Sequence, residues 1–124
     1  MSIQSAAKAA KSIFSLFVKE IKHLTSNEFR FKLRQANRAR LIDVSTEEEY
    51  KELHIPGSLN CDVLSPDFIN KLEYMDRNRS YFIYCRNGSR SGKAVRLMEE
   101  MGFRRIYSLI SGLESWHGTL ERSY

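Results

Sequence analysis

The sequence predicts an α/β fold, in which helices cover both faces of a parallel sheet. Short apolar runs, such as residues 41–44 and 81–84, alternate with segments of helical periodicity. The clearest helical segment has apolar residues at positions 94, 95, 97, 98 and 101. Such alternation is typical of strand–helix–strand units. Because ligands in these sheets bind beyond the carboxyl ends of the strands, residues that follow a strand are the first candidates for a site.

Residues 3–21 have the pattern of an amphipathic, basic helix. Apolar residues recur at spacings of three and four, and lysines and serines fall on the other side. We therefore divide the chain into this helix, residues 1–20, and one domain, residues 21–124. A helix of this kind usually packs on its own domain or on a second copy of the chain, which makes a homodimer contact one expectation. Contact with a membrane surface or a partner, and a targeting role, are the alternatives.

The first half of the domain is expected to contain two extended segments and two capped helices. Thr46 can cap a short helix whose glutamates lie at its favourable N-terminal end, and Thr25 precedes a helical segment with Glu28 three residues after it. That spacing is the signature of a capping box. Asp43 is the one polar residue of its run, as suits a strand buried on both faces. The expected elements are an extended piece at 21–24, a helix from Thr25 to about Gln35, a strand at 41–44 and a helix at 47–53.

The second half continues the alternation after a turn. Pro56 and Gly57 are residues that favour turns, and Gly102 stands where a left-handed glycine would end a helix. The expected elements are a strand within 59–63, a helix from 66–67 to about 75, a strand at 81–84, a helix from the loop after it to 102, a strand at 105–109 and a helix at 112–117.

Composition narrows the classes of function. Residues 1–40 carry nine Lys and Arg against two Glu, whereas residues 41–124 carry slightly more acidic than basic residues. We attribute the basic excess to a solvated helix face, and we expect no nucleic-acid partner. Two cysteines and three scattered histidines match no metal-site spacing, and no cofactor is expected. Two cysteines also make no disulfide framework, so a reducing, cytoplasmic location is expected.

Cys85 is the strongest candidate for chemistry. It ends an apolar strand pattern, and the polar residues after it lead into a helix. Unpaired amides at a helix N-terminus, together with the charges of Arg86 and Arg90, would favour the thiolate form, which is the nucleophile. A buried structural cysteine is the alternative, but a loop with this many polar residues is poorly suited to line a hydrophobic core. The candidate site residues are Cys85, Arg86, Asn87, Gly88, Ser89 and Arg90.

Four segments in this order resemble a single-domain rhodanese. They are Cys85-Arg86-Asn87-Gly88-Ser89-Arg90-Ser91, Leu41-Ile42-Asp43-Val44 with Glu49-Tyr50, His54-Ile55-Pro56-Gly57-Ser58-Leu59-Asn60, and Gly102-Phe103 followed by Ile106-Tyr107 and Gly112-Leu113-Glu114-Ser115-Trp116. The resemblance covers about residues 22–120. The chain departs from the family at Ser45, where an arginine is usual, and at Ser111-Gly112, where two glycines are usual.

The resemblance implies a mostly parallel sheet of about five strands and a persulfide cycle. Cys85 would take a sulfane sulfur from a small anionic donor such as thiosulfate and pass it to cyanide or a thiol. The amides of residues 86–90 would hold the outer sulfur, and Arg86 and Arg90 would attract the donor. A protein that relays sulfur is a further expected partner.

Other functions remain as alternatives. The same fold serves cysteine phosphatases and arsenate reductases, but the loop length differs. In phosphatases the second arginine stands six positions after the cysteine, and here Arg90 stands five after it. A non-catalytic adaptor or anion sensor, recruited through the basic helix, is the alternative from another class. Cys61 either resolves the persulfide as a disulfide or fills the core, and Asp43 is expected to be a capped structural carboxylate.

Overall fold

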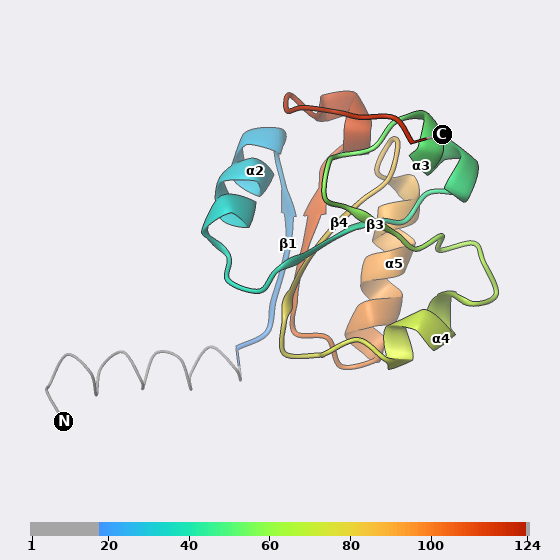
Figure 1. Ribbon diagram of the computed structural model, residues 1–124. Helices are drawn as coiled ribbons and strands as arrows, with labels where there is room; N and C mark the ends of the chain where they lie inside the picture. The colour runs from blue at the N-terminus through green and yellow to red at the C-terminus, as the bar shows by residue number, and fades with distance from the viewer. Residues whose placement is uncertain (1–17, 124) are drawn as a thin grey trace, which may run out of the picture.

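The structure is a computed structural model that describes residues 18–123. It contains one sheet of five strands, all parallel, in the order β1-β5-β4-β2-β3 (Figure 1). The fold class and the parallel sheet expected from the sequence are therefore confirmed. The elements are β1 (Glu20–Leu24), α2 (Ser26–Gln35), β2 (Arg40–Asp43), α3 (Glu47–Glu52), β3 (Leu59–Asn60), α4 (Phe68–Glu73), β4 (Ser80–Tyr84), α5 (Ser89–Glu100), β5 (Arg105–Leu109) and a final 3₁₀ turn, η1 (Gly112–Ser115).

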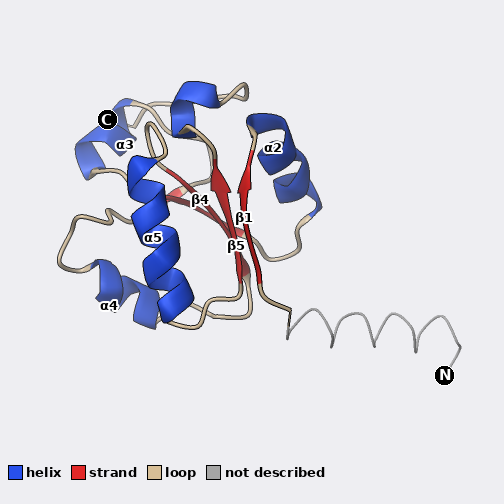
Figure 2. Ribbon diagram, turned by 180° about the vertical axis from the view of Figure 1, so that it is seen from behind, coloured by secondary structure: helices blue, strands red, loops and turns tan. Residues whose placement is uncertain are grey.

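Helices cover both faces of the sheet, which forms two cores. On one face, Phe68 and Leu72 of α4 and Met98 of α5 pack against inward side chains of the central strands. On the other face, Phe29 of α2 packs edge-on against Phe82 at 5.2 Å between ring centroids. Figure 2 shows α4 and α5 on one side of the strands and α2 on the other. This burial is the main stabilising contribution to the fold.

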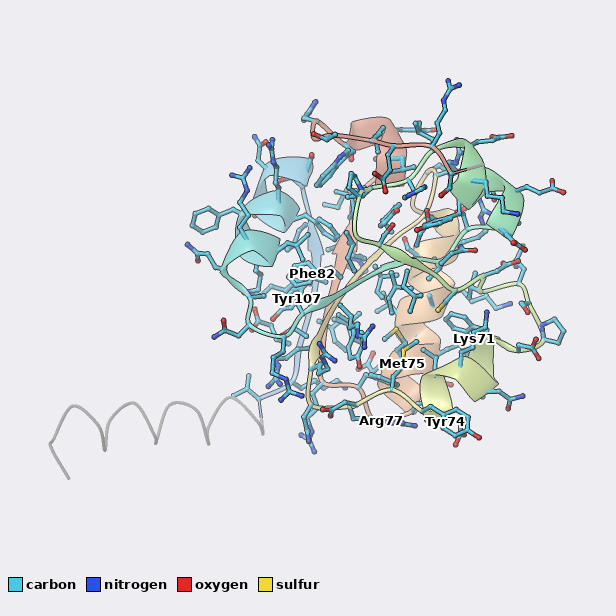
Figure 3. The ribbon with its side chains drawn as sticks, in the orientation of Figure 1. Lys71, Tyr74, Met75, Arg77, Phe82 and Tyr107 are labelled. Carbon is cyan, nitrogen blue, oxygen red and sulfur yellow. The ribbon has the colours of Figure 1, made fainter. Side chains whose placement is uncertain are left out.

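Two aromatic side chains of the sheet belong to the core on the α2 face. Phe82 and Tyr107 lie on the side of the sheet that α2 covers, with ring centroids 4.9 Å apart, and Figure 3 places them away from Met75 and Arg77.

Arg77 lies just after α4, and its guanidinium donates to the carbonyl oxygens of Leu72, Glu73 and Met75. These bonds tie the segment after α4 to the C-terminal end of the helix.

The capping box predicted at Thr25 forms, and the predicted cap at Thr46 is a capping box as well. The Thr25 side chain accepts from the amide of Glu28, and the Thr46 side chain accepts from the amide of Glu49. Each glutamate accepts in return from the amide of its threonine, at 3.0 Å and 3.1 Å respectively. Local sequence therefore sets where α2 and α3 begin.

Several boundaries differ from the expected ones. Strand β3 has two residues, and after it only the backbone amides of Cys61 and Val63 bond to the neighbouring segment, at the carbonyl oxygens of Asp43 and Val44. Helix α4 begins at Phe68 and ends at Glu73, so it is shorter at both ends than expected. The expected last helix is a 3₁₀ turn of four residues, because Trp116 after it is extended.

The expected N-terminal helix falls largely on residues outside the described part of the chain. Where it reaches described residues it is wrong, because Glu20 and Ile21 pair in parallel with β5 as the start of β1. The division of the chain at residue 20 stays a prediction. Among residues 18–123, no helix has the length and apolar character needed to cross a membrane.

Candidate functional site

The Cys85 thiol lies at the carboxyl end of β4, in the loop that leads into α5. Its sulfur accepts hydrogen bonds from the Gly88 amide at 3.1 Å and from the Ser91 amide at 3.3 Å. The side chain is fully buried beside the apolar core of the α5 face. Two amide donors on one sulfur stabilise negative charge there, as hydrogen bonds to a charged acceptor do. The loop expected from the sequence therefore folds around the thiol.

The loop keeps this shape through its own side chains. Gly88 precedes α5 with a φ of 93°, a left-handed conformation that glycine adopts without strain. The Asn87 side-chain oxygen accepts from the amide of Ser89 at 3.0 Å and from its hydroxyl at 2.8 Å. The Ser91 hydroxyl donates to the Gly88 carbonyl oxygen at 2.9 Å. Each of these contacts is local, so the loop sequence itself determines the turn.

The C-terminal turn η1 supports the loop from outside. The Leu113 amide donates to the Cys85 carbonyl oxygen at 2.9 Å, and the Glu114 amide donates to the Arg86 carbonyl oxygen at 3.2 Å. Gly112 makes this approach possible, because a Cβ there would lie 2.1 Å from the Cys85 oxygen. No other residue type fits at this position without moving backbone.

Arg90 is held by helix α3. Its two Nη groups donate to both oxygens of the Glu49 carboxylate, at 2.5 Å and 2.9 Å. The paired guanidinium holds the pKa of the Glu49 carboxyl at about 2, and the Thr46 cap contributes in the same direction. In turn, the pKa of Arg90 is raised by Glu49 first and by the nearby Cys85 and Asp62 charges second. The arginine is fixed beside the thiol, but a carboxylate occupies its hydrogen-bonding edge.

Arg86 also reaches α3 rather than the space above the thiol. Its Nη2 donates to the Glu49 carbonyl oxygen at 2.7 Å and lies 3.3 Å from a carboxylate oxygen of Glu52. We expected both arginines to face an incoming anion, and the structure directs both toward the acidic helix instead. The reason is the position of α3, which begins just beyond the carboxyl end of β2 and so lies beside the loop (Figure 1). Their role toward a donor stays a prediction.

A buried carboxylate lies behind the loop. One oxygen of Asp43 accepts from both the amide and the hydroxyl of Ser45, which confirms a capped carboxylate. Its other oxygen and the Nε of Arg86 are buried with no partner among the described residues. Burial raises the pKa of the Asp43 carboxyl above its usual value, against the hydrogen bonds from Ser45. At position 45, where the family usually has an arginine, this chain has a serine that donates hydrogen bonds to the Asp43 carboxylate.

Cys61 does not lie within reach of Cys85. The Cys61 amide bonds to the Asp43 carbonyl on β2, and the Val44 amide bonds to the Tyr84 carbonyl on β4, so Val44 separates the two cysteines. Two strand spacings amount to about 9.6 Å, beyond the roughly 7 Å limit for a disulfide between Cα atoms. Both thiols are free, and Cys61 is a buried core residue whose thiol pKa is raised by burial. The structure favours the core-filling role.

Sequence reasoning missed three contributors to the site: Ser91, Glu49 and Gly112. The Ser91 amide is the second donor to the sulfur, and the helix start at residue 89 was the available signal for it. Glu49 was noted only as one of the glutamates of its helix and as part of a motif, and its contact with Arg90 spans 41 positions, so no local pattern in the sequence indicates that contact. Gly112 was noted only as part of a motif. Within residues 18–123, no group of three acidic, His or Cys side chains is placed to hold a metal.

Comparisons with known proteins agree with the fold. A family model described as "Rhodanese-like domain" matches residues 26–119. A crystal structure of a rhodanese-like domain protein from Staphylococcus aureus aligns over 83% of this chain and 99% of that chain, with a TM-score of 0.72 and 27% identity. The "Thiosulfate sulfurtransferase GlpE" of Coxiella burnetii is 30% identical over 61% of this chain and 69% of its own length.

A further relative is longer than this chain. The "Putative sulfur carrier protein YrkF" of Bacillus subtilis is 27% identical over 82% of this chain, and the match spans 54% of that protein. The chain therefore covers about half of that relative's length.

Proposed function

Because the chain belongs to the rhodanese-like domain family, a family with sulfurtransferases among its members, we propose that it transfers sulfane sulfur through a persulfide on Cys85. The observation that carries the proposal is the pair of amides, Gly88 and Ser91, that donate to the Cys85 sulfur. An inert core cysteine has no need of two such donors, whereas a thiolate nucleophile is stabilised by them.

The reaction has two balanced steps. In the first, the Cys85 thiolate attacks the outer sulfur of thiosulfate, the sulfur–sulfur bond of the donor breaks, and sulfite leaves with the electron pair. In the second, cyanide or a thiolate attacks the outer sulfur of the Cys85 persulfide, and the thiolate is released again. These are displacements at sulfur of the thiol–disulfide type, so they require neither a metal nor a proton relay.

The loop amides are the groups that would hold the outer sulfur. Ser89 donates to Asn87, but the amides of Arg86, Asn87 and Arg90 donate to no protein acceptor among residues 18–123. Loop amides without a protein acceptor, of which Arg86 and Asn87 are adjacent, can bind an anion. The second arginine, five positions after Cys85, closes a loop that suits one added sulfur better than a phosphoryl group.

Intact-mass measurement tests this function. Thiosulfate treatment should add about 32 daltons, one sulfur atom, and cyanide should remove the addition while thiocyanate appears. Cys85→Ser should gain no mass, and Cys61→Ala, which keeps the loop, should gain as much as the wild type. A folded wild-type protein that gains no mass from any sulfane donor would contradict the enzyme and favour the adaptor. Transfer to a second protein is measured the same way, by the mass of that partner.

A further inference from the structure

A cavity at the amino ends of the strands takes no part in the chemistry of Cys85. It has a volume of about 310 Å³ and lies where α4 ends, and Figure 1 shows α4 at the end of the molecule away from α3. Arg79, which borders the cavity, stands just before β4, and Cys85 stands just after it. Six residues at about 3.3 Å each separate the two by roughly 20 Å. The cavity is therefore distinct from the candidate active site.

Strand pairing brings one wall of the cavity together. Arg40 of β2 is the register partner of Tyr81 on β4, so their Cα atoms are about 4.8 Å apart. Because side chains alternate along a strand, Arg40 lies on the same face as Tyr81, which packs in the core that α4 and α5 cover. Leu59 of the edge strand β3 pairs with Ile42 and lies on this face as well. Arg40 and Leu59 thus border one space, from two neighbouring strands.

The cavity has a surplus of positive charge, because its charged lining residues are Arg40, Arg79 and Asp76. Asp76 is already engaged: one carboxylate oxygen accepts from the Asn78 amide at 2.8 Å, and the other lies 3.7 Å from the Arg38 guanidinium. Arg79 donates through its Nε to the Arg38 carbonyl oxygen at 2.7 Å, which leaves its Nη groups without an acceptor among residues 18–123. In the same part of the chain, no carboxylate or carbonyl group pairs with Arg40. Both guanidiniums can therefore bind an anion.

An aromatic side chain stands at the edge of the same cavity. Tyr74 follows α4 and is 93% exposed, and Figure 3 shows it near Met75 and Arg77 at the end of that helix. An exposed ring of this size offers a face on which another planar ring can stack. Nucleic-acid bases stack on tyrosine whatever their identity. Met75 and Leu59 add apolar surface inside the cavity, against which a sugar or a ring can pack.

We propose that this cavity is a second binding site, for a small organic phosphate that carries a planar ring, of the class of a mononucleotide. The phosphate lies against the guanidiniums of Arg40 and Arg79, and the ring stacks on Tyr74. Two guanidiniums beside a carboxylate that is already compensated favour a dianion over a neutral ligand. The volume of about 310 Å³ is near the lower end of the range for small-molecule sites, which favours one nucleotide over a strand of nucleic acid.

Calorimetric titration with AMP, inorganic phosphate and adenosine tests the site in the wild type and four variants. Arg40→Gln removes one guanidinium, and Tyr74→Ala removes the exposed ring. Arg34→Gln and Phe31→Ala are the matched controls, because both residues are exposed on α2, which covers the other face of the sheet (Figure 2). Circular dichroism checks that each variant folds.

We expect the wild type to bind AMP with a Kd below about 1 mM, and at least tenfold more tightly than phosphate or adenosine, because each of these fills only part of the site. Arg40→Gln should weaken AMP binding about tenfold through the loss of a charged contact with the phosphate. Tyr74→Ala should also weaken AMP binding about tenfold, through lost stacking, and should change phosphate binding by less than about twofold. The two controls should bind AMP within about twofold of the wild type.

Three results would overturn the proposal. The first is a wild type that binds AMP no more tightly than phosphate, or that does not bind AMP at millimolar concentration. The second is AMP binding that folded Arg40→Gln and Tyr74→Ala keep at the level of the controls, because the ligand would then lie elsewhere, such as at the amides of the Cys85 loop. The third is a single-stranded oligonucleotide that binds more than tenfold more tightly than AMP, which would make nucleic acid the ligand instead.

Discussion

Gly112→Ala tests whether η1 is what holds the Cys85 loop in shape. The added Cβ would lie 2.1 Å from the Cys85 oxygen, where ordinary contact begins at 3.4 Å, so the two backbones must separate by about 1.3 Å. Two hydrogen bonds between η1 and the loop would be lost, at about 1 kcal/mol each. The φ of 58° adds about 1 kcal/mol of strain for alanine. We expect a loss of about 3 kcal/mol in the free energy of unfolding.

The same displacement should slow persulfide loading by tenfold or more, because an error of about 1 Å in the position of a reacting group is costly. Urea unfolding and the rate of mass gain measure the two effects. Gly57→Ala is the matched control: its φ is 83°, but a Cβ there has no atom within 4 Å, so only strain of about 1 kcal/mol is expected. The reasoning is refuted if Gly112→Ala costs no more than Gly57→Ala and loads at the wild-type rate.

Three further changes test separate features of the site. Ser111 has a φ of 62°, so Ser111→Gly should relieve strain and raise the free energy of urea unfolding by about 0.5 kcal/mol; a clear decrease would contradict this. Burial raises the pKa of Asp43, so the folded state binds that proton more tightly than the unfolded state does. The stability of the wild type should therefore fall relative to that of Asp43→Asn as the pH rises from about 4 to 7. A difference in unfolding free energy that does not change with pH would refute this prediction. Cys61→Ala should lower the free energy of thermal unfolding by about 1 kcal/mol, through lost packing, and leave the rate of the 32-dalton mass gain unchanged; a slower rate would give Cys61 a part in the reaction.

The features that sequence predicted well are those set by neighbouring residues. The capping box at Thr25, the cap at Thr46 and the turn after Cys85 depend on contacts within a few positions. Periodicity and caps report such contacts directly. The α/β class followed from the same local signals, since alternating strands and helices have few ways to bury their apolar faces together.

The features that sequence missed depend on residues far apart in the chain. The contact between Arg90 and Glu49 joins α5 to α3, and its effect is to compensate a charge that seemed available for a donor. The side-chain amide of Asn60 likewise donates to the carbonyl oxygens of Asp43 and Ser45, which lie 17 and 15 positions before it. Charge and polarity can be counted from sequence, but which charges meet is decided only when the helices pack.

The first and last strands along the chain lie next to each other in the sheet, because β1 pairs with β5 along its whole length. The Cys85 loop depends in the same way on η1, which follows β5. During synthesis, residues 20–24 must therefore wait for some eighty later residues to leave the ribosome before they find their partner. Until then the thiol lacks the outer support of its loop. A nascent or truncated chain would expose a cysteine without the geometry that directs its chemistry.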